Sequence, residues 1–219
     1  GSNLTEVTKT SLVQSLKSYA VASVTPVIID PETTFITLTT TFKYDSSLTT
    51  KDVSTLQTNV LDAVSSYNTD TLEDFTGMFR YSAVGKTIDE ADTSILSNIT
   101  KIKMYKYITP TLSSGLKYTL SFNNAFYNPH SGHNASAGGI VSSTGFKINN
   151  DSSTNEHFLD DDGAGNIRVY YLSGTTRIYT DSTFGTINYT TGEIILTSAN
   201  ITSISNVDGA ASTQIRVTT

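Results

Sequence analysis

The stretch "HFLDDDGAGNIRVYYLSGTTRIYTDSTFGTINYTTGEIIL", His157 to Leu196, decides the fold class of the second half of the chain. It repeats one plan three times: an apolar or aromatic run, a turn that contains glycine, and a second run. Glycine supplies the positive φ that tight hairpin turns require. The alternating segments "LKYTLSF" before this stretch and "TQIRV" after it extend the pattern. We therefore expect a β-rich domain over residues 111–219, built mostly of antiparallel hairpins in a meander, a sandwich or a partly open barrel.

The first half, residues 1–110, alternates helix and strand signals. "FITLTTTFKY" indicates a half-buried strand, whose inner face carries Ile36, Leu38, Thr40, Phe42 and Tyr44. "VSTLQTNVLDAVSSYN" has the spacing of an amphipathic helix, with Thr49 and Asp52 as a capping box before it and Asn68 at its end. Helices are also predicted in "SLVQSLKSYA" and after Ser82, and a strand in "NITKIKMYKYITP". The sequence thus predicts an α+β fold, with helices packed on a small mixed sheet in this half.

Composition narrows the function classes. The net charge is -6 and the densest basic run is "KIKMYK", Lys101 to Lys106, which we interpret as a solvated strand face, so nucleic acid is not an expected partner. No apolar run is long enough to span a membrane. The absence of cysteine excludes disulfides and thiol catalysis. Only 16% of residues are charged, while Ser and Thr are abundant, which suits surfaces that pack against protein.

The stretch "NPHSGHNASAGG" contains two of the three histidines, His130 and His133, in a His-x-x-His spacing. Structural zinc normally takes four ligands and catalytic zinc three plus water, and the remaining histidine, His157, is distant in sequence. The surrounding Asn, Ser, Gly and Pro are typical of a loop. We therefore predict a loop or interface here, with His130 and His133 as incomplete metal candidates.

The acidic turn "DDDGAGN" resembles a calcium loop only in part. Asp160, Asp162 and Ala164 fall at its first, third and fifth positions, where the fifth lacks an oxygen ligand, and Tyr171 stands where a bidentate Glu is needed. A hairpin turn with solvated acids is the simpler interpretation. Asp160 and Asp162 remain metal candidates on this basis, and we predict no bound metal and no cofactor.

Catalytic motifs are lacking, so we predict that the chain is not an enzyme and has no small-molecule substrate. The acids of "EDF" and "DEAD" are expected on water-facing helical surfaces, and no nucleophile elbow, phosphate loop or zinc-protease helix is readable. Phe126 and Tyr127 could either cap the β core or contact a neighbouring subunit. The interface candidates are Phe126, Tyr127, His130 and His133.

The segments "TPVIIDP", "FRYSAVGKTIDEAD" and "ITKIKMYKYITP" give residues 1–110 a pattern that resembles the baseplate J-like family of contractile phage tails. Further segments, "DTSILSN", "FNNAFYNPHSGHNASAGG", "FLDDDGAGN" and "NVDGAASTQIR", are similar to the large baseplate wedge proteins of T-even-like phages. The opening "GSNLTEV" lacks an initiator Met and starts with what we interpret as a cloning scar, Gly1-Ser2, so a C-terminal or middle fragment is expected.

This resemblance implies a structural role in the virion, in the tail baseplate, after assembly in the host cytoplasm. It implies a chain that dimerises and joins wedges into a ring around the central hub, with itself and other wedge subunits as partners. It transfers no catalytic residues. Two alternatives stay open: a tail-fibre-like adhesin module that binds a host surface glycan, and a metal-dependent hydrolase in which His130, His133 and an acid converge.

Overall fold

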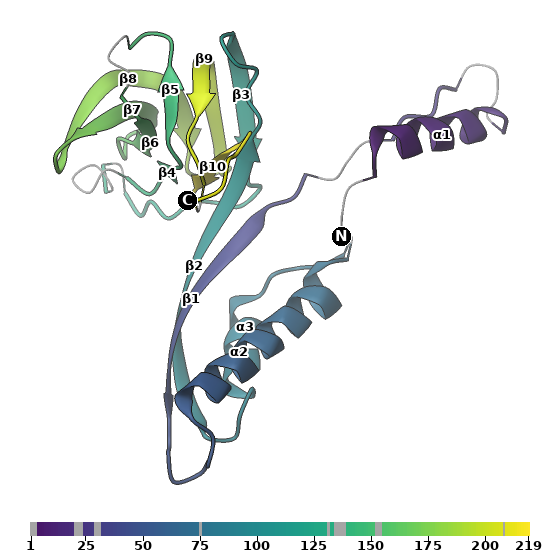
Figure 1. Cartoon of the computed structure of the whole chain (residues 1–219), viewed down its shortest axis with the longest axis vertical. Helices are drawn as coiled ribbons and strands as arrows, with labels where there is room; N and C mark the ends of the chain where they lie inside the picture. Colours follow the sequence, from purple (N-terminus) through teal and green to yellow (C-terminus); the bar gives the residue numbers. More distant parts are fainter. Residues whose placement is uncertain are drawn as a thin grey trace. The chain divides into compact units, whose positions relative to one another are not determined.

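The computed structural model describes residues 4–19, 24–28, 32–74, 76–130, 132–133, 139–151, 155–207 and 209–219, so the predictions for Gly1-Ser2 and for Ala20 lie outside the described residues. The chain divides into two compact units (Figure 1). The first comprises Gly1–Glu32 and Thr39–Lys101, and the second comprises Thr33–Leu38 and Ile102–Thr219. The predicted division into two domains at residue 110 stays a prediction, because it concerns which parts of the chain fold independently.

The first unit contains α1 (Glu6–Lys17), α2 (Val53–Tyr67), a π-helical turn η1 (Asn68–Leu72) and α3 (Tyr81–Asp89), with parts of β1 (Phe35–Tyr44) and β2 (Ile95–Ile108). Helices α2 and α3 pack together through buried apolar residues, namely Leu56, Val60, Val84 and Ile88. The amide nitrogen Nδ2 of Asn98 on β2 donates to the backbone oxygen of Gly85 at 2.9 Å, which ties α3 to the strand. Burial of Leu56 and Val60 in the middle of the predicted apolar stripe stabilises α2, whereas Val53 at its start is exposed.

Both predicted ends of α2 need correction. Asp52 itself is the N-cap, because its carboxylate accepts from the backbone N–H of Thr55 at 2.9 Å, whereas the Thr49 hydroxyl accepts from Lys51 outside the helix. A carboxylate is as good an N-cap as a hydroxyl, and the chain uses the nearer one. Asn68 stays in the right-handed region at φ -61° and leads into η1, so it does not end the helix through a left-handed conformation.

A small sheet has the strand order β1-β2-β10-β4, where β10 is Ile215–Thr218 and β4 is Ser142–Ser143. β10 is antiparallel to both β2 and β4, so the sheet expected to be mixed is antiparallel in these pairings. β1 alternates between exposed and half-buried residues as predicted. In β2, Lys106 is buried at 7% exposure with its Nζ 6.0 Å from the Phe122 ring centre. The predicted solvated face of Lys101 to Lys106 is therefore wrong at Lys106, because this residue is out of phase with Lys101 and Lys103 and lies on the same side of β2 as Met104 and Ile108.

The second unit contains an antiparallel barrel, which confirms the predicted α+β class and β-rich second half. Its strands are β5 (Phe146–Ile148), β6 (His157–Asp161), β7 (Asn166–Ser173), β8 (Thr176–Asn188) and β9 (Glu193–Ile204), and β3 (Gly115–Ser121) pairs with β9 outside the ring. Adjacent strands pair from β5 through β9, and β9 also pairs with β5, so the ring closes. The link between β5 and β6 consists of one residue pair, Phe146 with His157. The core is filled by side chains such as Phe146, Leu159, Ile167, Val169, Ile194, Leu196 and Ile201.

Candidate functional site

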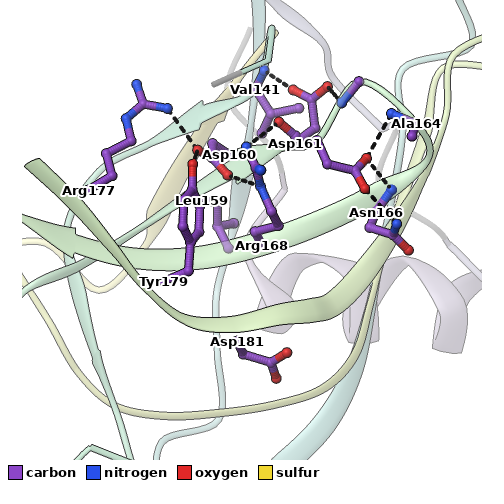
Figure 2. A network of polar contacts seen from close by, with 12 residues as sticks. Val141, Leu159, Asp160, Asp161, Ala164, Asn166, Arg168, Arg177, Tyr179 and Asp181 are labelled. Carbon is purple, nitrogen blue, oxygen red and sulfur yellow. Dashed lines mark hydrogen bonds and ion pairs between the residues drawn. The ribbon is translucent and has the colours of Figure 1, made fainter. Parts of the chain in front are cut away.

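Three consecutive aspartates lie where β6 ends and the turn to β7 begins, and each has its own set of protein donors. Figure 2 shows this network around Asp160 and Asp161. Asp160 is 1% exposed, and its carboxylate accepts from Arg168 Nε at 2.9 Å, Arg177 Nη1 at 2.7 Å and the Tyr179 hydroxyl at 2.9 Å. The guanidinium of Arg168 also lies over the Tyr179 ring at 4.3 Å. Burying a carboxylate is tolerable only when it is paired in this way, so Asp160 crosslinks β6, β7 and β8.

Asp161 is fully buried and binds the segment around Ile140 and Val141 to the barrel. Its Oδ1 accepts from the backbone N–H groups of Ile140 and Val141 at 2.7 and 2.8 Å, and its Oδ2 accepts from the Tyr189 hydroxyl. Burial raises the pKa of Tyr189 and the bond to Asp161 raises it further, so this hydroxyl stays protonated and donating. Gly139 approaches so closely, at φ +77°, that a Cβ there would collide with the Asp161 carboxylate.

Asp162 closes the turn between β6 and β7. It accepts from the backbone N–H groups of Ala164 at 2.8 Å and Asn166 at 2.9 Å and from Asn166 Nδ2 at 2.6 Å. Burial alone would raise the pKa of Asp162, but the hydrogen bonds from Asn166 and Ala164 together lower it. Asp160 and Asp162 share no donor, so these two metal candidates serve separate structural bonds. Within the described residues, no group of three His, Cys, Asp or Glu side chains is arranged to hold a metal ion.

The acidic turn also supports the loop that carries the exposed histidines. Gly132 N donates to the backbone oxygen of Gly163 at 2.9 Å, and Gly163 N in turn donates to Asp161 Oδ2 at 3.3 Å. His133 Nδ1 lies 3.1 Å from His130 Nε2, with the two rings perpendicular. Tyr127 meets the His133 ring edge-on at a centroid distance of 5.4 Å. The sequence analysis identified both histidines. It could not identify the hydrogen bond between Gly132 and Gly163, because these residues are 31 positions apart and no local pattern indicates the contact.

His157 is not part of that loop. It lies on β6 and is buried, with Nδ1 3.0 Å from the Asn155 carbonyl oxygen and Nε2 3.1 Å from the Thr180 hydroxyl and 3.2 Å from Asp151 Oδ2. Burial lowers the pKa of His157, although the nearby Asp151 carboxylate opposes this. Among the described residues, neither His157 nor an acidic side chain therefore joins His130 and His133 in the convergence that the hydrolase alternative would need.

Two other predictions are corrected by burial. Phe126, an interface candidate, is 7% exposed and packs edge-on against Phe122 at 5.3 Å, so its side chain belongs to the core and is not available to a partner. Tyr127 is 71% exposed and, with His130 and His133, stays a predicted interface residue. In "DEAD", the Asp92 carboxylate does not face water: it accepts from Lys51 Nζ at 2.6 Å and from Ser94.

The first unit leaves one face of its two strands uncovered. Helices α2 and α3 lie on the other side of β1 and β2 (Figure 1). The exposed side chains form what we call the open ribbon face, defined by Thr39, Thr41, Lys43, Ser97, Ile99 and Lys101. β1 is an edge strand, and β10 pairs with β2 only from Tyr105 to Ile108. Among the described residues, no strand therefore pairs with the outer edge of either strand in this unit.

Other surfaces offer little enclosure. A hollow of about 60 Å³ in the second unit is lined by Ile148, Asn150, Thr180, Asp181, Phe184, Ser198 and Asn200. An open hollow of about 280 Å³ in the first unit is lined by Thr40, Thr41, Phe42, Tyr44, Val53 and Gln57. On α1, the predicted apolar stripe has no buried residue: Leu12 and Leu16 are exposed, and so is Tyr19, which lies just beyond the helix. No helix in the described part of the chain is long and apolar enough to cross a membrane.

Comparison with known proteins bears on these surfaces. Residues 32–107 match the family described as baseplate structural protein gp6, C-terminal domain III, a range that contains β1, α2, α3 and nearly all of β2. The chain is also similar to baseplate wedge protein gp6 of Enterobacteria phage T4, with 28% identity over 151 residues, covering 60% of this chain. It spans 23% of the length of that relative.

Proposed function

We propose that this chain is a structural component of a contractile phage tail baseplate, located in the virion, and that it works by binding protein without catalysis. Two similarities support this proposal. Residues 32–107 are similar to a baseplate structural domain, and a larger part of the chain is similar to a baseplate wedge protein. Assembly in the host cytoplasm belongs to the same proposal.

The open ribbon face is the structural observation that carries it. A two-stranded ribbon with one bare face and two unpaired edges is marginally stable in water and offers unpaired backbone N–H and C=O groups to another chain. The exposed side chains of this face are mainly hydroxyl and aliphatic, including Ile99 at 69% exposure. Hydroxyl groups cost less to desolvate than ions, so such a face can be buried against protein.

The finer part of the proposal is that the chain dimerises and that dimers join wedges into a ring around a hub, with other wedge subunits as further partners. A closed ring requires each copy to present interfaces whose symmetry closes. The two unpaired ribbon edges suit addition of a strand from a neighbour. Tyr127, His130 and His133, all exposed in the second unit, are candidates for another contact.

Crosslinking mass spectrometry on intact tails tests the proposal, read at Lys101, one of the two exposed lysines of the open ribbon face. We expect crosslinks from Lys101 to a second copy or to another baseplate subunit. Ile99→Glu should abolish incorporation of the chain into tails while its melting temperature stays unchanged. The matched control is Leu172→Glu, at 50% exposure on β7, which should still be incorporated. A tail that accepts the Ile99 variant as readily as the control would contradict this role for the ribbon.

The glycan-binding adhesin remains the alternative. Its most suitable place among the described residues is the hollow over β1 and α2, where Phe42 and Tyr44 supply aromatic surface. Glycan-array binding that is lost in Phe42→Ala would favour it over a purely structural role.

A further inference from the structure

We propose that His130 and His133 form half of a metal site that is completed by the same pair from a second copy of this chain. The inference rests on the proposed self-association and adds that a metal ion joins the two copies. The metal class is a late first-row divalent ion such as Zn²⁺, Co²⁺ or Ni²⁺, for which neutral imidazole is a preferred ligand.

The spacing of the pair suits a chelate. In the structure the two facing nitrogen atoms, His130 Nε2 and His133 Nδ1, are hydrogen-bonded at 3.1 Å with the rings perpendicular, and a bound metal would take the place of the shared proton. With zinc–nitrogen bonds of about 2.0–2.1 Å, this separation corresponds to a nitrogen–zinc–nitrogen angle of roughly 100°, close to the tetrahedral value. As ligands, His130 would keep its single ring proton on Nδ1 and His133 would keep it on Nε2.

The loop holds this geometry without a metal. His133 N donates to the His130 backbone oxygen at 3.0 Å, which closes the turn between them. Gly132 N fixes the turn to Gly163, whose position depends on the buried Asp161 carboxylate. Tyr127 sets the orientation of the His133 ring through the edge-on contact. Preorganised ligand rings lower the cost of ordering the site when a metal binds.

One chain supplies two ligands, and no third His, Cys, Asp or Glu joins them among the described residues. Structural zinc sites are almost always four-coordinate. Because a twofold axis brings the same residues of two copies together, two exposed His pairs meeting on such an axis provide four nitrogen ligands. Each copy carries a net charge of -6, so a divalent cation at the contact also offsets part of the repulsion between copies.

The test titrates ZnCl₂ into the purified chain and follows bound zinc by calorimetry and mass by analytical ultracentrifugation, with EDTA reversal. Co²⁺ substitution reports coordination, because a tetrahedral site absorbs visible light much more strongly than an octahedral one. We expect half an equivalent of zinc per chain, a zinc-dependent dimer and a tetrahedral cobalt spectrum. All three should be lost in His130→Asn and in His133→Asn, and retained in the control Thr119→Asn, an exposed change on β3.

The outcomes separate this inference from the proposed function. Zinc binding at one equivalent without dimerisation would overturn the second-copy site. No zinc binding, or binding unaffected by both histidine variants, would overturn the metal site altogether. A dimer that forms equally in EDTA and in His133→Asn would overturn the metal inference and leave self-association supported.

Discussion

Replacing Asp161 by Ala tests whether the acidic turn serves the fold. The change removes the acceptor for three backbone N–H groups, those of Ile140, Val141 and Gly163, and for the Tyr189 hydroxyl. Each buried donor left without a partner costs roughly 1–3 kcal/mol, and one or more can be partly rescued by water entering the space of the lost carboxylate. We therefore expect a loss of about 4 kcal/mol of unfolding free energy, equivalent to a melting point lower by about 10 °C.

Differential scanning calorimetry of the whole chain measures this directly, and it shows separate transitions if the two units unfold independently. The matched control is Asp162→Ala, which removes hydrogen bonds at the partly exposed turn and should cost only about 1 kcal/mol. The reasoning is refuted if Asp161→Ala melts within 2 °C of the native chain, or if the Asp162 variant is the less stable of the two.

Three further predictions concern other buried groups. Leu56→Asp should unfold the first unit, since a fully buried side chain would become charged, whereas Leu61→Asp on the same helix, at 69% exposure, should not; helical circular dichroism reports the difference. The bond to Lys51 and the bonds to Ser94 hold the pKa of Asp92 well below its usual value. The ionised Asp92 therefore stabilises the folded chain above about pH 4, and this contribution is lost as the pH falls further. Asp92→Asn should be less stable than the native chain at pH 6 and show a smaller fall in melting temperature from pH 6 to pH 3. Burial lowers the pKa of His157, so below about pH 6.5 the unfolded chain takes up the proton first and stability falls; His157→Gln should flatten this fall in melting curves between pH 7.5 and pH 5.5.

Periodicity predicted the elements of this protein better than their ends. The alternation of β1 and the stripe of α2 are properties of consecutive residues, so Leu56 and Val60 could be assigned to the core from sequence. The helix ends depend on which of several polar side chains reaches a free N–H group, and Asp52 competes with Thr49 at close range. Lys106 is buried because it lies on the same side of β2 as Met104 and Ile108, so the alternation of the strand was a better guide to its exposure than its charge.

The candidate site was predictable by residue type and not by partner. The histidine spacing and the acidic turn stand out in the sequence, but the calcium alignment grouped Asp160 with Asp162 and gave Asp161 no role. In the structure, the alternating directions of a strand send Asp160 and Asp161 to different partners. Phe126 and Tyr127 illustrate the same limit, since one of two adjacent aromatic residues is buried and the other exposed.

The single residue pair between β5 and β6 gives the barrel a preferred line of opening. A ring with one weak pairing can open locally there while the remaining strand pairs stay intact. Amide protons of Phe146 and Lys147 should therefore exchange with deuterium faster than those of β7, which is paired along both edges. Under load, such a barrel would unroll into a sheet before losing its other pairings. In the baseplate role proposed above, a barrel that opens along one line could deform with its neighbours and recover.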